Sequence, residues 1–528
     1  MSRMFHFRCS VAVLSLLCAP AWTQPVLVAQ PLPLGRAALT QTVTSEMVAP
    51  GVAHYRIRRG APDKAGTWML MSAVVTSPDG LARVRKCFDT LGLDAASGGF
   101  KLDSSTQQHY DVLHGGRYPS RVAAQAAEAR AKALQCPLFA RHSSEDESNV
   151  SGPWVIDVVA LIPGSAAALL AAVGPQGTGL VRQASALAKS TGALAAVNGG
   201  FFVERDDDGF PGQPSGISII DGRLNSGSVN ARPAVLLKLG ASPAATILRH
   251  VDMATYLLWP DGARTVIDGI NRKPGKARNC GRGVQELPVH DHTCSYADDV
   301  VYFPTGSGFA PATAQFGAVV RFAIDAGGML HRLGAGAAAS ASEATLVVTN
   351  ASARLAEIER RASAHQLAAF KADSGVPGIL VAGSYVVNAG PTLLIGGAAV
   401  HDEVAEGWGI GVIDDSGHDL LMHDWVNRRN PRTALGIKDD GTILLVTVDG
   451  HRHDSSVGLT IDELRKVLKA LGARDAANLD GGGSTTLVLA GRLVNQPSDL
   501  AGERSVGDTI LIASPKPDTA RAVQGSVQ

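Results

Sequence analysis

The sequence is poor in charged and aromatic residues, and neither sign of charge is in excess. Charged residues make up 18% of the 528 positions and aromatic residues 5%, while 48 basic and 48 acidic side chains leave a formal net charge of zero. Nucleic-acid-binding proteins normally carry a basic excess, and disordered chains combine high net charge with low hydrophobicity. We therefore expect neither class. Hydrophobic residues reach 45%, which is sufficient for a large folded core.

Long hydrophobic runs are absent as well. No stretch approaches the roughly 18 continuous apolar residues that cross a bilayer, so we expect no membrane span. Near the start, Arg3 and Arg8 precede a short apolar run at 11–17 and small residues at 19–21, which is the pattern of a cleaved signal peptide. This predicts a periplasmic or secreted bacterial protein. A lipid-modified Cys18 is the alternative, but Leu17 stands where a small residue is expected.

Cysteine is scarce, with six residues in the whole chain. Removal of the signal peptide also removes Cys9 and Cys18, and an even number of cysteines outside the cytosol favours disulfides. A zinc site is the competing interpretation, but the sequence has no CxxC pair to support it. Proximity along the chain favours the pairs Cys87–Cys136 and Cys280–Cys294.

Glycine is abundant, at 58 of 528 residues, and follows no repeat. This predicts many tight turns in a strand-rich fold, and the fold class we expect is α/β in the broad sense of a mixed α+β protein. The charge-poor stretch 25–50 and the polar stretch 142–149 are typical of linkers. The predicted organisation is a signal peptide (1–21), a linker (22–51), a small α+β domain (52–142), a linker (143–153), a large sheet-and-helix domain (154–514) and a flexible tail (515–528).

The small domain contains a strand, a glycine turn and a helix capped by Ser120 within residues 110–134. This segment resembles the SPOR domain, a small sheet-and-helix module that binds bacterial peptidoglycan. The resemblance implies glycan strands of peptidoglycan as a partner. An ordinary α+β domain that packs on the rest of the chain is the alternative.

Two segments of the large domain follow one theme, a helix followed by a strand and a glycine turn. The first has a helix over 180–190, a strand over 194–197 and the sequence Asn198-Gly199-Gly200. The second has a helix over 461–471, a strand over 476–479 and the sequence Asp480-Gly481-Gly482-Gly483-Ser484. Thr460 and Glu463 form a capping box for the second helix. Each segment therefore places a polar side chain where a strand meets a glycine turn.

Two predicted hairpins bring further polar residues to this region. If Asp440-Gly441 is a two-residue loop, Arg432 lies opposite Asp449. The strand over 442–448, the helix and the strand over 476–479 then form a β-α-β unit with parallel strands, so Asp449 and Asp480 share the carboxyl-terminal edge. A second hairpin that turns at 490–491 places Asn495 near Ser484 and Thr485.

Five segments in this order resemble the phosphodiester glycosidase family. The resemblance implies hydrolysis of the sugar–phosphate bond of a sugar-1-phosphodiester, such as an N-acetylglucosamine-1-phosphodiester, on cell-wall or exopolysaccharide material. The segments are Asn198-Gly199-Gly200-Phe201-Phe202, Asn430-Pro431-Arg432-Thr433-Ala434, Val448-Asp449-Gly450, Asn478-Leu479-Asp480-Gly481-Gly482-Gly483-Ser484-Thr485 and Val494-Asn495-Gln496-Pro497-Ser498.

We assign roles within this motif set as a hypothesis. Asp480 is the nucleophile or general base, Asp449 orients it or shares its proton, and Arg432 holds the phosphodiester. The phosphate is also held by Arg504 and the Gly481–Gly483 amides. The expected sugar-binding set completes the site: Asn198, Gly199, Gly200, Thr433, Ser484, Thr485 and Asn495.

Some residues depart from the family pattern. Val203 stands where a polar or acidic residue is expected, so Glu204 or Asp206 is considered as its substitute. His451 and His453 follow Asp449-Gly450, and we interpret them as surface-loop histidines rather than acid–base groups or ligands.

Three alternatives stay open at this point. Asp206 and Asp208 lie in a glycine-containing acidic run that offers oxygen ligands for calcium, although the spacing does not match an EF-hand. A metal-assisted phosphodiesterase that cleaves the P–O bond is one rival function. A non-catalytic protein that binds cell-wall glycans is the other.

Overall fold

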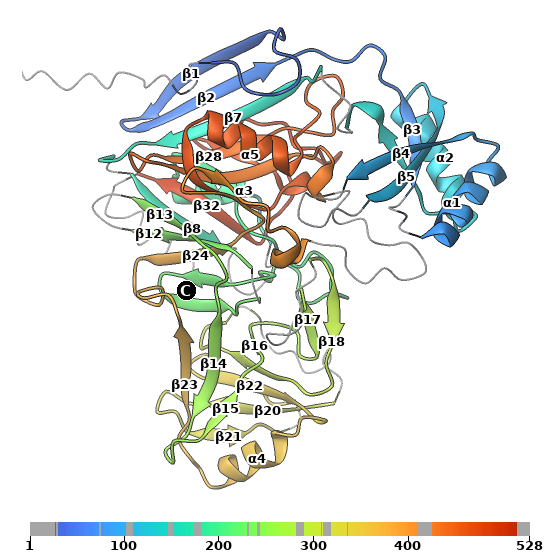
Figure 1. Ribbon diagram of the computed structural model, residues 1–528. Coiled ribbons are helices and arrows are strands. Elements are labelled where there is room, and N and C mark those ends of the chain that lie inside the picture. The colour runs from blue at the N-terminus through green and yellow to red at the C-terminus, as the bar shows by residue number, and fades with distance from the viewer. Residues whose placement is uncertain are drawn as a thin grey trace, which may run out of the picture.

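The structure is a computed structural model of the 528-residue chain. It describes residues 27, 30–72, 75, 77–101, 109–145, 151–165, 167–173, 181–229, 232–239, 243–280, 290–307, 309, 318–334, 336–408 and 425–514. The predicted signal peptide and the predicted tail lie outside these residues. Figure 1 shows a strand-rich body, a small sheet-and-helix unit beside it, and a lobe that extends away from the body. Within the described part, no helix has the length and apolar character needed to cross a membrane.

An eight-stranded sheet forms the centre of the body, and its neighbouring strands are antiparallel. In spatial order its strands are β1 (Gln41–Ala49), β2 (Val52–Arg59), β7 (Trp154–Leu161), β28 (Ile443–Val448), β27 (Arg432–Lys438), β29 (Ala473–Asn478), β25 (Thr392–Ile395) and β26 (Ala398–Ala399).

A second sheet of five strands packs against one face of the first. Its order is β31 (Arg492–Leu493), β30 (Leu487–Leu489), β9 (Ala195–Asn198), β32 (Asp508–Ala513) and β8 (Ala168–Val173), and α3 (Ala184–Thr191) precedes β9. Because strand side chains alternate between faces, Leu435 of β27 enters the core between the sheets. Its neighbour Ala434 faces α5 (Ile461–Ala470) on the other side of the eight-stranded sheet.

The sequence signals that predicted α5 are present in the structure. The Thr460 hydroxyl accepts the Glu463 N–H, and the Glu463 carboxylate accepts the Thr460 N–H, which confirms the capping box. Leu464 and Leu468 lie on the buried face, and Gly472 follows the helix with a φ of +88°. Its lack of a Cβ allows this left-handed conformation, which ends the helix.

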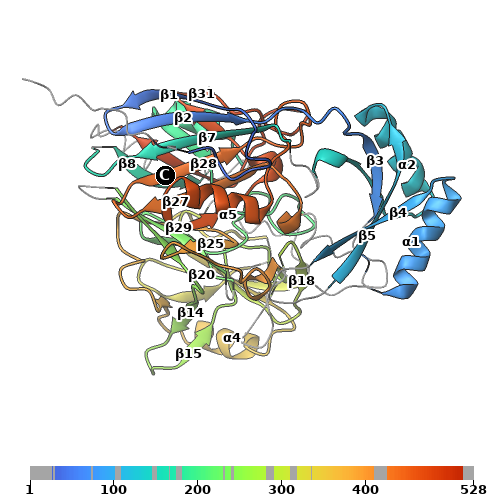
Figure 2. The same cartoon turned by 45° about the horizontal axis from the view of Figure 1, so that its top comes forward.

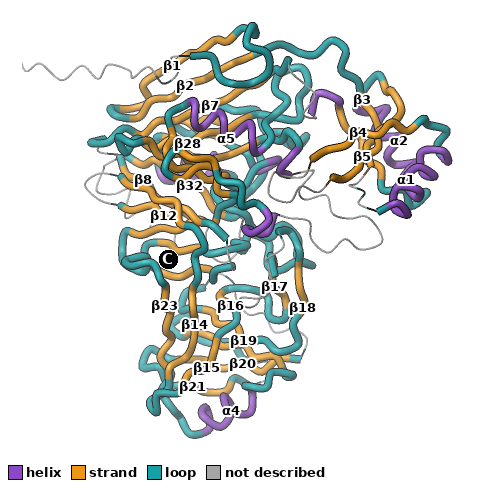
Figure 3. The backbone as a smooth tube through the Cα atoms, in the orientation of Figure 1, coloured by secondary structure: helices purple, strands orange, loops and turns teal. Residues whose placement is uncertain are grey.

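In the lobe inserted between β9 and β25, the regular secondary structure is strands joined by loops, with the helix α4 (Leu355–Ser363) at its outer end, as Figure 3 shows. A five-stranded sheet joins it to the body, in the order β11 (Arg223–Ser226), β10 (Ser218–Ile220), β24 (Ser384–Asn388), β12 (Ala234–Lys238) and β13 (Ala244–Leu248). The outer part contains β14 (Met253–Leu258), β15 (Arg264–Val266), β16 (Gly269–Ile270), β17 (Lys276–Arg278), β18 (Thr293–Ser295), β19 (Val300–Phe303), β20 (Val319–Ile324), β21 (Leu330–Arg332), β22 (Ala344–Thr349), β23 (Ala369–Ser374) and α4 (Leu355–Ser363).

The small unit is a four-stranded antiparallel sheet with two helices on its outer face (Figure 2). Ser77 and Ser120 cap its helices, and the predicted Cys87–Cys136 disulfide joins α1 to the residues after α2. The elements are β3 (Trp68–Ser72), α1 (Pro78–Thr90), β4 (Ala95–Lys101), β5 (His109–Tyr118), α2 (Arg121–Ala133) and β6 (Leu138–His142).

The predicted linkers contain regular structure, and β2 lies in a different unit from the one predicted. The linker predicted over 22–51 contains β1, whose polar residues face solvent at the edge of the large sheet, and β2 joins that sheet rather than the small unit. Residues predicted to form the second linker include the 3-10 turn Ser143–Glu145, in which Glu145 is buried and ion-paired to Arg428. The SPOR-like assignment of the small unit stays a prediction.

Candidate active site at the carboxyl ends of β28 and β29

The loop between β27 and β28 has three residues, so the predicted two-residue loop is wrong. The Lys438 N–H donates to the Thr442 carbonyl at 2.9 Å, and Gly441 has a φ of +82°. Arg432 therefore pairs with Val448 instead of Asp449. A one-residue change of register reverses the face to which a side chain points. Arg432 consequently faces the α5 side of the sheet, whereas Asp449 faces the second sheet.

The predicted parallel arrangement of β28 and β29 is present, with β27 between them. Each strand pairs antiparallel with β27, so both end at the same edge, where Asp449 and Asp480 follow. One intervening strand separates the two backbone positions by about 10 Å. Among the described residues no hydrogen bond joins the two carboxylates. The predicted sharing of a proton between Asp449 and Asp480 therefore has no direct contact to support it.

Asp480 lies in a charged cluster with Glu204 and Arg504. Its carboxylate accepts the Gly481 N–H at 2.8 Å and is partly exposed. Burial raises the pKa of Asp480 to about 7, the Ser484 hydroxyl opposes this rise, Glu204 adds to it, and Arg504 opposes it. Arg504 forms ion pairs with both Glu204 and Asp499.

The glycine loop after Asp480 allows Arg504 to approach closely. A Cβ at Gly483 would overlap both Arg504 and Asp499, so no larger residue fits there without displacing the ion pair. The Gly482 N–H donates to the Pro431 carbonyl at 3.0 Å, which fixes the loop against the start of β27. The structure thus brings the predicted residues Arg504 and Gly481–Gly483 to Asp480, together with Glu204 but without Arg432.

Asp449 belongs to a separate, buried network. Its Oδ1 accepts the Asn495 side-chain amide at 3.2 Å and the Gln496 N–H at 3.0 Å. Burial raises the pKa of Asp449 to about 6, and the nearby Asp157 adds to the rise. Asp157 binds Arg56 through two hydrogen bonds of 2.9 Å and the His54 Nε2 at 2.8 Å.

Sequence reasoning missed Asp157, Arg56 and His54. The available signal was a single acidic residue within the apolar run Trp154–Leu161. The second hairpin agrees with its prediction, because Leu489 pairs with Arg492 and the Asn495 amide donates to the Thr485 carbonyl at 3.0 Å. Asn495 thereby links Asp449 to the segment that carries Thr485.

Asn198 and its glycines connect strands inside the protein. The Asn198 Nδ2 donates to the Asp480 carbonyl at 2.7 Å, and its Oδ1 accepts from the Thr433 hydroxyl at 2.7 Å. Asp508 accepts the Gly200 N–H at 2.7 Å and would overlap a Cβ at Gly199. Asn198, Thr433, Ser484 and Thr485 are all buried. Their contacts position Asp480, and their predicted contacts with sugar stay a prediction.

Arg432 lies outside the carboxylate cluster. Its Nε donates to the Leu459 carbonyl at 2.8 Å, its Nη2 donates to the carbonyls of Trp425 and Arg428, and the guanidinium lies 5.0 Å from the ring centre of Trp425. Burial lowers the pKa of Arg432 to about 9, which leaves it charged at neutral pH.

The residues considered as calcium ligands, and the two histidines considered as acid–base groups or ligands, have partners within the protein. Asp206 pairs with Lys273 at 3.1 Å, and Asp208 pairs with Arg205 and Arg278 at 3.0 and 3.2 Å, so their charges are already neutralised and a calcium site there is disfavoured. The His451 Nε2 lies 2.9 Å from the Asn430 Oδ1, and burial lowers its pKa to about 4. His453 stacks on His142 with ring centres 4.3 Å apart. We therefore assign structural roles to both histidines rather than roles in acid–base chemistry or metal binding.

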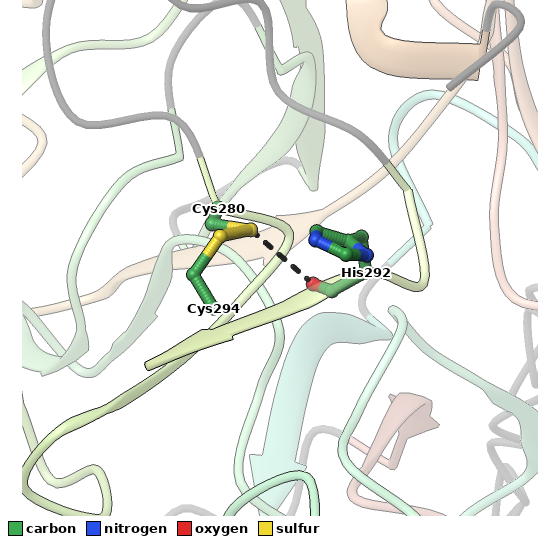
Figure 4. A group of neighbouring side chains, drawn as sticks. All are labelled: Cys280, His292 and Cys294. Atoms are coloured by element: carbon green, nitrogen blue, oxygen red, sulfur yellow. Dashed lines mark hydrogen bonds between the residues drawn. A yellow bond between two sulfur atoms is a disulfide. The ribbon is translucent and has the colours of Figure 1, made fainter. Parts of the chain in front are cut away.

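Cys280, His292 and Cys294 lie close enough together to hold a metal ion, but the two sulfur atoms are bonded to one another (Figure 4). A disulfide has no thiolate for zinc. Both predicted disulfides are therefore confirmed, and the zinc alternative has no support in the oxidised protein.

Comparison with known proteins points to one family. The model of the phosphodiester glycosidase family matches residues 306–513, which include Asp449, Asp480 and Arg504. A crystal structure from Burkholderia pseudomallei, of a protein described as exported, has a TM-score of 0.81 and is 31% identical over 94% of this chain and 100% of that chain.

Curated relatives match shorter segments. The uncharacterized SPbeta prophage-derived protein YomE of Bacillus subtilis is 37% identical over 115 residues, which are 21% of this chain and 18% of that protein. Mouse N-acetylglucosamine-1-phosphodiester alpha-N-acetylglucosaminidase is 40% identical over 75 residues, which are 14% of each. The chain thus matches less than a fifth of the length of these curated relatives.

Proposed function

Residues 306–513 match the phosphodiester glycosidase family, and we propose that the protein hydrolyses the bond between the anomeric carbon of a sugar and the phosphate of a sugar-1-phosphodiester. The family match supports a glycosidase role in general. The observation that carries the specific proposal is Asp480, a partly exposed carboxyl group whose pKa is raised to about 7. A carboxyl group that titrates near neutral pH is suited to general acid–base catalysis.

Asp480 is the residue that acts on the anomeric centre. As a general base it removes a proton from water while the water oxygen bonds to the anomeric carbon and the bond from that carbon to the phosphate oxygen breaks. The products are the free sugar and a phosphomonoester. Because a phosphomonoester is a stable leaving group, the step depends less on a strong acid than on stabilisation of charge.

Glu204 and Arg504 complete this centre. Glycosidases generally use two carboxylates, and the contacts favour Glu204 over Asp449 as the second one, because Glu204 interacts with both Asp480 and Arg504. Arg504, which is ion-paired to Glu204 and Asp499, lies beside the glycine loop, where its guanidinium can donate hydrogen bonds to the departing phosphate. Asp449 is nearly enclosed, with 6% of its surface exposed, and holds the neighbouring segment in place.

Hydrolysis in oxygen-18 water tests the proposal. We would incubate the protein with a panel of sugar-1-phosphodiesters and locate the label by mass spectrometry. Label in the sugar supports the proposal, and label in the phosphate indicates a phosphodiesterase that cleaves P–O. Asp480→Asn should abolish turnover, while Asp439→Asn, which changes an exposed loop carboxylate, should leave it unchanged.

The cellular setting belongs to the same proposal. Two disulfides and a similar protein described as exported fit a secreted protein. We propose that it acts in the bacterial periplasm or outside the cell on phosphodiesters of wall or exopolysaccharide material. Peptidoglycan binding by the small unit rests on its SPOR-like sequence, and a pull-down with purified peptidoglycan would test it.

A further inference from the structure

Four buried arginines form no ion pair among the described residues: Arg59, Arg232, Arg321 and Arg432. Of these four, Arg232 and Arg432 also have buried side-chain N–H groups without a hydrogen-bond partner. Arg232 is 4% exposed and Arg432 is fully buried, and neither forms an ion pair within the described part of the chain. Other buried arginines are paired to acids: Arg272 to Asp299, Arg428 to Glu145, Arg429 to Glu463 and Arg465 to Glu403. Asp291 and Glu406 favour the charged form of Arg232, and Glu463 favours that of Arg432, but none of them forms an ion pair with these arginines. A buried cation without a directly bonded counter-charge is unfavourable unless a ligand supplies one.

The same two side chains have hydrogen-bond donors to spare. Nε and Nη2 of Arg232 and Nη1 of Arg432 have no partner among the described residues, and the same holds for the indole N–H groups of Trp408 and Trp425. Arg232 uses one further N–H, which donates to the His290 Nδ1 at 2.9 Å. The Glu406 Oε1, which belongs to a carboxylate near Arg232, is an unpartnered acceptor in the same region. The unpartnered groups of the two arginines and two tryptophans are all donors, so a ligand for them must offer acceptors.

Stacked aromatic rings connect the two arginines. The Arg232 guanidinium lies 4.7 Å from the ring centre of Trp408, and Trp408 stacks on Trp425 at 5.9 Å with an interplanar angle of 14°. Arg432 lies 5.0 Å from the ring centre of Trp425. Contact with an indole face stabilises a cation but leaves the in-plane N–H groups of the guanidinium unsatisfied. The aromatic rings therefore explain why the charges are tolerated and not what they bind.

This arginine–tryptophan cluster (Arg232, Trp408, Trp425 and Arg432) adjoins the catalytic loop. A Cβ at Gly481 would lie 3.1 Å from the Trp425 ring, and Trp425 is partly exposed. Phe201, three residues after Asn198, contacts both tryptophans, with ring centres 5.1 and 5.9 Å away. The cluster thus lies next to Asp480, on the α5 side of β27.

We propose that the arginine–tryptophan cluster binds the anionic phosphodiester group of the substrate, with Arg232 as a recognition residue that none of the sequence motifs contains. A phosphodiester carries one negative charge and oxygen acceptors only, which matches two guanidinium groups and indole donors. The inference rests on the proposed function, since it assigns the phosphate half of that substrate to a defined set of donors.

The first test measures anion binding without turnover. Dimethyl phosphate serves as the charged probe and trimethyl phosphate as its uncharged counterpart, with the intrinsic tryptophan fluorescence of the protein, to which Trp408 and Trp425 contribute, as the readout. We expect a saturable change with dimethyl phosphate alone, and Arg232→Met should weaken that binding at least tenfold. Binding of both probes with equal affinity, or unchanged binding by the variant, would overturn the inference.

A matched control separates recognition from folding. Arg361 also lies 4.7 Å from an indole ring, that of Trp259 in the lobe, but it is paired to Glu357 and Asp261. Arg361→Met should not alter the response to dimethyl phosphate. Removal of Arg232 should lower the unfolding midpoint only slightly, because it breaks no ion pair and removes one hydrogen bond to His290 and the contact with the Trp408 ring. A strongly destabilised Arg232→Met protein would instead show that Arg232 is structural.

Turnover distinguishes failure of this inference from failure of the proposed function. If Arg232 binds the phosphodiester, Arg232→Met raises KM or lowers kcat/KM for labelled substrate. If the protein binds dimethyl phosphate through Arg232 but places oxygen-18 in the phosphate, the anion site stands and the glycosidase proposal fails. If it labels the sugar with unchanged kcat/KM in Arg232→Met, the function stands and the inference fails.

Discussion

Replacement of Asp480 by asparagine should stabilise the protein at alkaline pH while it abolishes activity. The pKa of Asp480 rises from 3.8 to about 7 in the folded protein, so folding favours the protonated form. The native state therefore loses stability as the pH rises from 3.8 to about 7 and the unfolded chain alone ionises. One pKa unit is worth about 1.4 kcal/mol, which gives an upper limit of about 4 kcal/mol.

Partial exposure and the nearby Arg504 reduce this limit. Solvent screens the ionised form, so we expect a gain of ~2 kcal/mol for Asp480→Asn at pH 8 and almost none at pH 4. Urea unfolding of both proteins at the two pH values measures the difference. Asp439→Asn serves as the exposed control. If Asp480→Asn has the same effect at both pH values, folding does not raise the pKa of the carboxyl group, and its assignment as a near-neutral acid–base group is wrong.

Two further substitutions test the surroundings of Asp480. Glu204→Gln removes a like charge and should lower the pKa of Asp480. If Asp480 is the base, the acid limb of the plot of kcat/KM against pH moves to lower pH. An acid limb that stays in place argues against Glu204 as a neighbour of the base. Gly483→Ala should displace Arg504, destabilise the protein by about 2 kcal/mol and lower kcat/KM about a hundredfold. Gly334→Ala, which has open space around it, is the control, and equal activity of the two variants would show that Arg504 has no role in catalysis.

Local patterns predicted the parts of the fold in which neighbouring residues decide the structure. The capping box of Thr460 and Glu463 defines the start of α5, and the turn at Ala490-Gly491 sets the register of β30 and β31. The two disulfides followed from proximity along the chain. In each case the interacting groups are close in sequence, or few alternatives compete.

Local sequence patterns did not predict the contacts between segments that are distant in the chain. The strand β2 pairs with β7 about a hundred residues later, and nothing in its sequence distinguishes that partner from a strand of the small unit. The buried bond between Asp157 and Arg56 depends on the same pairing. The arginine–tryptophan cluster is assembled from Arg232, Trp408, Trp425 and Arg432, so only the folded chain shows it.

The register of a single hairpin decides how the charges of the site are divided. With Gly441 in a left-handed conformation, the loop gains one residue, and Arg432 turns toward α5 while Asp449 turns toward the second sheet. Arg504 is the cation that acts on Asp480, and burial outweighs its effect, so the pKa of Asp480 rises. A two-residue loop would have placed Arg432 beside Asp449 instead, with both side chains on one face of the sheet. The separation of Arg432 from Asp449 on opposite faces of the sheet thus follows from one extra loop residue.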